Sequence, residues 1–127
     1  MPPRVTVVDD DISVRESLKS LISSFGMDVK VFASAEALMS SSHPCMTDCF
    51  IFDVRLPGMS GIELNRHLIE RGCQVPAIFI TGHATDQRTR ADAWQDSTIA
   101  YLIKPFSEDE LLSAVQTALK WKPTGNA

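Results

Sequence analysis

Five short apolar runs, each followed by a helical pattern, constrain the fold of this 127-residue chain more than any other feature. The runs are rich in β-branched and aromatic residues and show no polar alternation, which is typical of strands buried on both faces. Such runs alternating with helices predict an α/β fold, a parallel sheet covered by helices on both sides. The expected strands span residues 5–8, 29–32, 49–52, 76–80 and 99–103.

The segments between these runs carry signals for the start and the end of helices. Residues 84–96 have the weakest helical pattern, because apolar residues there are few. Two Ser-x-x-Glu sequences fit capping boxes, and two glycines follow the last apolar residue of a helix. The expected caps are Asp11, Ser34, the pairs Ser60/Glu63 and Ser107/Glu110, and the terminating glycines Gly26 and Gly72.

Length and composition indicate one ordinary globular domain. The net charge is −4 and no basic run occurs, so we expect no direct binding of nucleic acid. No signal peptide is evident and no apolar run approaches the ~18 residues of a membrane span, so we expect no membrane association. Three cysteines (Cys45, Cys49 and Cys73) without a secretion signal predict reduced thiols in the cytoplasm, and their spacing lacks a zinc ligand set.

Polar side chains follow four of the five expected strands. Asp9 and Asp10 follow the first, Asp53 the third, Thr81 the fourth and Lys104 the fifth. Asp53 alone would be an ordinary strand-end or turn residue. In a parallel sheet, however, all carboxyl ends lie on one edge, where α/β folds bind ligands. The convergence of these groups therefore favours a site.

The chemistry of these groups points to phosphate and a metal ion. Two carboxylates ~4 Å apart repel by about 4 kcal/mol at an effective dielectric constant of 20. A cluster of them is tolerable with Mg²⁺, which takes few carboxylates and also binds phosphate oxygens. A carboxylate can attack phosphorus to give an aspartyl phosphate, while a lysine and a threonine contact the transferred group.

With these motifs the chain resembles the receiver domain of two-component response regulators over roughly residues 4–121. Its Thr-Gly-His and Lys-Pro-Phe motifs are most similar to those of the FixJ-type subfamily. The resemblance implies a flavodoxin-like (βα)5 doubly wound sheet with strand order 2-1-3-4-5. We expect residues 1–121 to form the receiver domain and residues 122–127 a tail or the start of a linker to an output domain. The motifs that carry the resemblance are Val8-Asp9-Asp10, the stretch Phe52 to Gly61 around Asp53, Thr81-Gly82-His83 and Lys104-Pro105-Phe106.

The resemblance also implies a role for each site residue. Asp53 would accept a phosphoryl group from a sensor histidine kinase, and Lys104 would pair with the phosphate or with Asp53. A cis peptide bond is implied between Lys104 and Pro105. The remaining implied roles are Mg²⁺ binding by Asp10, Asp53 and the backbone carbonyl of Arg55 with support from Asp9, and switching by Thr81 and Tyr101.

The implied function is a phosphorylation-dependent switch. Its changed face, formed by the fourth helix, fifth strand and fifth helix, would control an output such as transcription through a DNA-binding domain outside this chain. A homodimer on phosphorylation is also implied. The chain would assist its own phosphorylation and dephosphorylation without acting as an enzyme on small molecules.

Three alternative functions compete with this one. The first is a protein-interaction domain that acts without phosphorylation. A phosphatase with an aspartyl intermediate is disfavoured, because Arg55 stands where such enzymes place a second aspartate. A flavodoxin-like cofactor carrier is disfavoured, because three acidic residues after the first strand would repel phosphate in the absence of metal.

The sequence departs from the family before the fifth strand. The family usually ends its fourth helix in Ala-Gly, but here residues 94–98 stand in that place, so Asp96 or Ser97 is expected to end the helix. We hypothesise that this helix is short, mobile or displaced. Trp94 is expected to pack within the domain, and His83 to lie on a loop at the rim of the site without acting as a general base.

Overall fold

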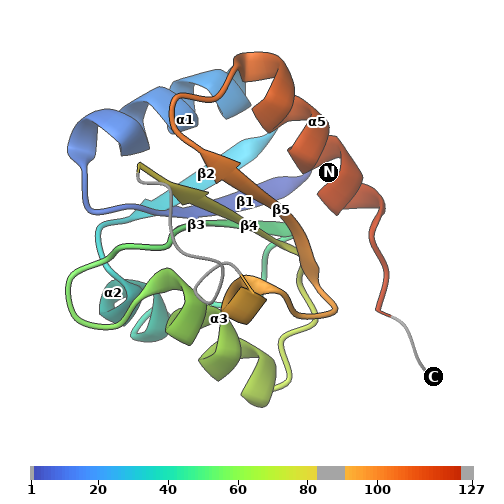
Figure 1. Cartoon of the computed structure of the whole chain (residues 1–127). Helices are drawn as coiled ribbons and strands as arrows, with labels where there is room; N and C mark the ends of the chain where they lie inside the picture. The colour runs from blue at the N-terminus through green and yellow to red at the C-terminus, as the bar shows by residue number, and fades with distance from the viewer. Residues whose placement is uncertain (1, 83–90, 124–127) are drawn as a thin grey trace.

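The computed structural model describes residues 2–82 and 91–123, which form a parallel five-stranded sheet of order β2-β1-β3-β4-β5 (Figure 1). This confirms the predicted α/β class and strand order. The strands are β1 Arg4–Val8, β2 Asp28–Phe32, β3 Cys49–Asp53, β4 Ala77–Thr81 and β5 Thr98–Ile103. The helices with assigned bounds are α1 Ile12–Ser24, α2 Ala35–Met39, α3 Gly61–Glu70 and α5 Glu108–Lys120.

Helices cover both faces of the sheet. Helices α1 and α5 lie on one face and α2 and α3 on the other (Figure 1). Successive side chains of a strand point to opposite faces, so Phe50 and Phe52 pack on the α2/α3 side and Ile51 on the α1/α5 side. Every residue of β3 and β4 is buried. Apart from Asp53 and Thr81 at their carboxyl ends, β3 and β4 are therefore apolar on both faces, as predicted.

The predicted helix caps are present. The Asp11 carboxylate accepts a hydrogen bond from the Ser13 N–H at 2.8 Å, and the Ser34 hydroxyl accepts one from the Ala37 N–H at 3.0 Å. Both Ser-x-x-Glu sequences form complete capping boxes. Helices α1 and α3 end at glycines with positive φ, Gly26 and Gly72.

The fourth expected helix, residues 84–96, falls partly on residues 83–90, which lie outside the described residues, as does His83. Residues 91–93 are helical. The hypothesis that this helix is short, mobile or displaced stays a prediction. None of the helices described is both long enough and apolar enough to cross a membrane.

A threonine side chain caps the end of this helical segment. The Thr98 hydroxyl donates to the Ala93 carbonyl oxygen at 2.7 Å and accepts from the Gln95 N–H at 2.9 Å. The expectation that Asp96 or Ser97 would end the helix was wrong, because the capping group comes from the first residue of β5. No residue other than glycine has a positive φ in the described part of the chain, so the turn after the helix avoids the left-handed conformation.

Two further expectations were wrong. Trp94 is 46% exposed and lines a surface groove with Ile69 and Trp121, so it does not pack within the domain. Cys45 and Cys73 form a disulfide, with their Cα atoms 5.5 Å apart, whereas reduced thiols were expected. Only a tertiary contact brings these two cysteines together, because 28 positions separate them in the sequence.

Candidate functional site

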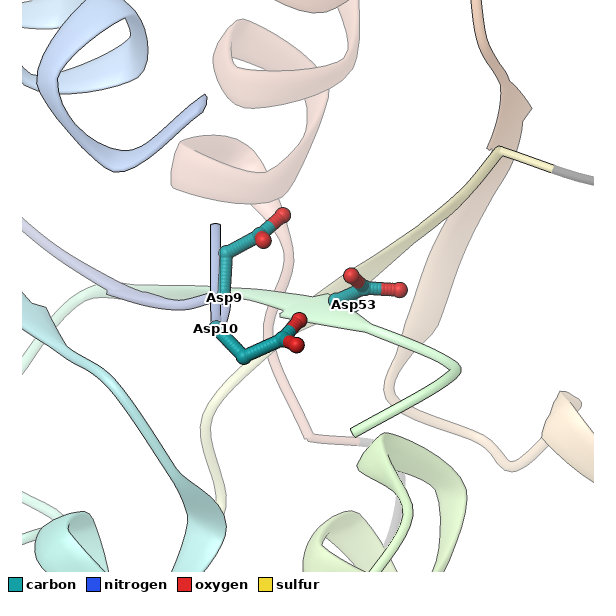
Figure 2. A group of neighbouring side chains, drawn as sticks. All are labelled: Asp9, Asp10 and Asp53. Atoms are coloured by element: carbon teal, nitrogen blue, oxygen red, sulfur yellow. The ribbon is translucent and has the colours of Figure 1, made fainter. Parts of the chain in front are cut away.

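Three carboxylates meet at the carboxyl edge of the sheet (Figure 2). Asp9 and Asp10 follow β1, and Asp53 is the last residue of β3. The two strands are neighbours in the sheet and Val8 pairs with Phe52, so the residues that follow this pair lie side by side. One ligand oxygen from each aspartate lies within 4.8 Å of the others. The sheet thus brings together the three aspartates of the predicted metal-binding set; the role of the Arg55 backbone carbonyl stays a prediction.

The three aspartates differ in burial. Asp9 is fully buried, Asp53 is 7% exposed and Asp10 is exposed. The Asp9 Oδ1 accepts a hydrogen bond from the Asp11 N–H at 2.9 Å, whereas its Oδ2 has no hydrogen-bond partner among the described residues. A buried carboxylate oxygen without a hydrogen bond is costly. A cation bound in the cluster would relieve that cost.

The pKa of Asp53 reflects this crowded position. Burial raises the pKa of its carboxyl from 3.8 to about 6. The hydrogen bond from the Arg55 N–H to Oδ1, 3.0 Å long, and the charge of Lys104 lower this pKa, while the charges of Asp9 and Asp10 raise it. At neutral pH the Asp53 carboxylate is therefore ionised at a cost in folding free energy. A group that neutralises its charge would bind here with a gain in stability.

Lys104 lies at the same edge, at the end of β5. Its ammonium Nζ forms an ion pair with Asp9 Oδ2 at 3.5 Å, so its partner in this structure is Asp9, whereas the sequence had predicted Asp53 or a phosphate. Its backbone N–H donates to the Thr81 carbonyl oxygen at 2.8 Å, which fixes the two strand ends together. The Lys104–Pro105 peptide bond is cis, as expected.

Thr81 and Tyr101 lie on the same face of the sheet. Thr81 ends β4 and is fully buried. Tyr101 pairs with Phe79 across β4 and β5, two positions before the pair that contains Thr81, so strand alternation directs both side chains to the α2/α3 side. The Tyr101 ring is 8% exposed and belongs to the core on that side. The aromatic residue predicted as a switch is thus turned inward here.

A family model described as the response regulator receiver domain matches residues 5–116. The chain belongs to this family. It is 44% identical over 119 residues to the response regulator protein TmoT of Ectopseudomonas mendocina, a match that covers 94% of this chain and 54% of TmoT. It is 38% identical over 115 residues to the transcriptional regulatory protein FixJ of Azorhizobium caulinodans, covering 91% of this chain and 54% of FixJ.

Solved structures agree with this assignment. The crystal structure of FixJ-N has a TM-score of 0.85 and 31% identity, and the match covers 98% of each chain. The receiver domain described here spans about half the length of the curated relatives it matches. Receiver domains of two-component response regulators are signalling domains rather than classical enzymes, and some of the relatives are named as transcriptional regulators.

Two residues that support the site of this receiver domain were not singled out from the sequence. A Cβ at Gly61 would collide with the carbonyl oxygen of Asp53, so only glycine fits where α3 begins. The Glu36 carboxylate of α2 accepts a hydrogen bond from the Met59 N–H at 3.2 Å and so holds the loop after Asp53. The position of Gly61, directly after the capping residue Ser60, is a sequence feature that could have drawn attention to it. Glu36 has no such feature, because its sequence context is that of any exposed helix residue.

Proposed function

We propose that this receiver domain is a phosphorylation-dependent signalling switch whose phosphoacceptor is Asp53. The supporting observation is the acidic cluster at the sheet edge, in which Asp9, Asp10 and Asp53 offer oxygens within 4.8 Å of one another, next to Lys104. A strand-end aspartate serving only as a turn residue would not need two further carboxylates and a lysine beside it. The phosphoryl donor would be a sensor histidine kinase.

The residues present fit Mg²⁺. The donors are carboxylate oxygens, the ligands this ion prefers, and the buried Asp9 Oδ2 lacks a hydrogen bond. Asp10, Asp53 and the backbone carbonyl of Arg55 would hold the ion, with Asp9 in support. When bound, Mg²⁺ supplies positive charge that offsets the charge of the phosphoryl oxygens.

The side chains around Asp53 have separate tasks. A carboxylate oxygen of Asp53 attacks phosphorus, so that an O–P bond forms as the bond to the donor nitrogen breaks. Lys104 exchanges its partner Asp9 for the new phosphoryl group, since its flexible stem lets the ammonium move between adjacent anions. Thr81 donates its hydroxyl hydrogen to a phosphoryl oxygen. The inward position of the Tyr101 ring then stabilises the changed conformation of the face that contains β5 and α5.

The wider setting follows from the family. We propose that residues 1–121 are the receiver unit and that residues 122–127 are a tail or lead toward an output domain that controls transcription. The chain would work in the cytoplasm, form a homodimer when phosphorylated, and assist hydrolysis of its own aspartyl phosphate.

The test is the intact mass of the chain after incubation with a small acyl phosphate. We expect a gain of one phosphoryl group that requires Mg²⁺ and is absent in Asp53→Asn. Asp96→Asn is the matched control, because Asp96 is an exposed carboxylate just before the amino end of β5, at the edge of the sheet opposite the cluster, and it should gain the group like the wild type. If calorimetry shows that Mg²⁺ binds but no mass is gained, the proposal fails and the phosphorylation-independent interaction domain takes its place.

A further inference from the structure

The disulfide lies at the edge of the sheet opposite the acidic cluster. Cys45 belongs to the segment between α2 and β3, and Cys73 to the segment between α3 and β4. Both segments lead into the amino ends of strands, whereas Asp53 is at a carboxyl end. The covalent loop closed by the disulfide contains all of β3 and α3, and therefore Asp53. This bond thus encloses the part of the domain that carries the proposed phosphoacceptor.

The three cysteines differ in exposure. Cys45 is exposed, Cys73 is 6% exposed and Cys49 is fully buried. Burial raises the pKa of the Cys49 thiol to about 12, so this thiol stays protonated and unreactive in the folded domain. The Cα atoms of Cys45 and Cys73 are 5.5 Å apart, a separation typical of a disulfide. The fold therefore provides one exposed sulfur, one buried partner beside it and one inert thiol.

We propose that Cys45 and Cys73 form a reversible thiol–disulfide couple, in which Cys45 exchanges with small-molecule disulfides and Cys73 resolves the mixed disulfide. The inference rests on the proposed cytoplasmic location in one respect: a disulfide in that compartment is usually transient and redox-sensing, not a permanent crosslink. Its redox partner is a low-molecular-weight thiol and its disulfide, of the glutathione class.

The exchange is balanced by the two forms of this partner. In the oxidising direction, the Cys45 thiolate attacks one sulfur of the small disulfide, forms a mixed disulfide and releases one small thiolate. The Cys73 thiolate then attacks the Cys45 sulfur, forms the internal disulfide and releases the second small thiolate. Two cysteine thiols are oxidised and one small disulfide is reduced to two thiols. The reverse sequence opens the internal disulfide and begins with attack at the exposed Cys45 sulfur.

Whether the Cys45–Cys73 pair is oxidised or reduced changes how tightly β3 and α3 are held in the domain. With the disulfide closed, the segments before β3 and β4 are held together at the amino edge. With it open, β3 and β4 remain paired by their hydrogen bonds and packed in the core, but the covalent tie between the segments before them is lost. A redox signal would thereby act on the strand that ends at Asp53 without any contact with the acidic cluster.

The test is thiol alkylation of the folded chain, read by intact mass. After equilibration in buffers from mostly reduced to mostly oxidised glutathione, we expect the rapid maleimide adduct at the exposed Cys45 to fall from one to none. A second adduct, at Cys73, should form more slowly in the reduced chain because this residue is 6% exposed. Cys49→Ala should give the same titration, since Cys49 is inert. Cys73→Ser should accumulate a mixed disulfide with glutathione at Cys45 on the order of tenfold faster than Cys45→Ser does at Cys73, because access governs the rate.

Three outcomes would overturn the proposal. The first is an adduct count that does not change with the glutathione ratio. The second is a disulfide that opens only at urea concentrations that also make Cys49 reactive, because the bond would then be a permanent crosslink. The third is equal glutathionylation of the two serine variants. The titration uses the wild-type chain and needs no phosphoryl donor, so its result is independent of whether Asp53 is phosphorylated.

Discussion

Replacement of Asp53 by asparagine should stabilise the metal-free domain at neutral pH. Asparagine has nearly the shape of aspartate, and its side-chain oxygen can still accept the Arg55 N–H, but it carries no charge. Burial and the neighbouring carboxylates raise the pKa of Asp53 from 3.8 to about 6. The variant therefore removes a charge that the folded state disfavours.

The sign and size of the effect follow from proton linkage. Between pH 3.8 and about 6 the folded Asp53 carboxyl binds more protons than the unfolded one, so the free energy of unfolding falls as pH rises through this window. A rise in pKa from 3.8 to about 6 corresponds to roughly 3 kcal/mol. Below pH 3.8 wild type and Asp53→Asn should be equally stable, and above pH 7 the variant should be more stable by about that amount.

Urea unfolding followed by circular dichroism between pH 3.5 and pH 8, with a chelator present, measures this difference. A gain of about 3 kcal/mol moves the urea midpoint up by roughly 1–3 M for a domain of this size. Asp96→Asn, which neutralises an exposed carboxylate, should leave the pH profile unchanged. A difference between wild type and Asp53→Asn that does not vary with pH, or a wild type that is the more stable at pH 8, would refute the reasoning.

Two further substitutions test how the backbone around the site is built. Gly61→Ala should lower the free energy of unfolding by about 3 kcal/mol or more, because its Cβ collides with the backbone of Asp53. In the control Gly26→Ala the new Cβ meets nothing within 4 Å, so the free energy of unfolding should fall only by the ~1 kcal/mol that a positive φ costs. Equal losses of stability for the two variants in urea unfolding would exclude the collision at Gly61. Thr98→Val should cost about 2 kcal/mol and speed amide exchange at Gln95, because the Ala93 carbonyl and the Gln95 N–H lose their buried partner. Thr117→Val, which removes an exposed bond within α5, should change neither measurement.

The sheet, its caps and the acidic cluster could be predicted because each depends on local patterns and one topological rule. Apolar runs such as Phe50–Phe52 indicate strands buried on both faces, and Ser60 with Glu63 marks a helix start within four residues. Once the strands are known to be parallel, their carboxyl ends must share an edge. Asp9 and Asp53, more than 40 positions apart in the sequence, are then expected to meet.

The remaining features depend on contacts that no local pattern encodes. The choice of Lys104 between Asp9 and Asp53 depends on where a flexible side chain finds the less solvated carboxylate, and Asp9 is the fully buried one. The capping role of Thr98 depends on how β5 enters the sheet beside the helix end. The Cys45–Cys73 bond depends on the approach of two segments that precede neighbouring strands.

The acidic cluster links the stability of the domain to its proposed chemistry. Burial of Asp9 and Asp53 at one strand edge costs free energy in the absence of a metal ion, as the raised pKa of Asp53 indicates. Asp9 Oδ2 makes no hydrogen bond within the described part of the chain, and its contact with Lys104 is an ion pair 3.5 Å long. The fully buried strands β3 and β4 offset that cost through apolar contacts on both faces. A cation bound in the cluster would relieve part of the same cost, whereas a phosphoryl group on Asp53 would replace one negative charge by roughly two and so add to it. The added charge at Asp53 would attract the Lys104 ammonium, which lies 3.5 Å from Asp9 Oδ2 before phosphorylation, and a switch at this edge requires such a movement.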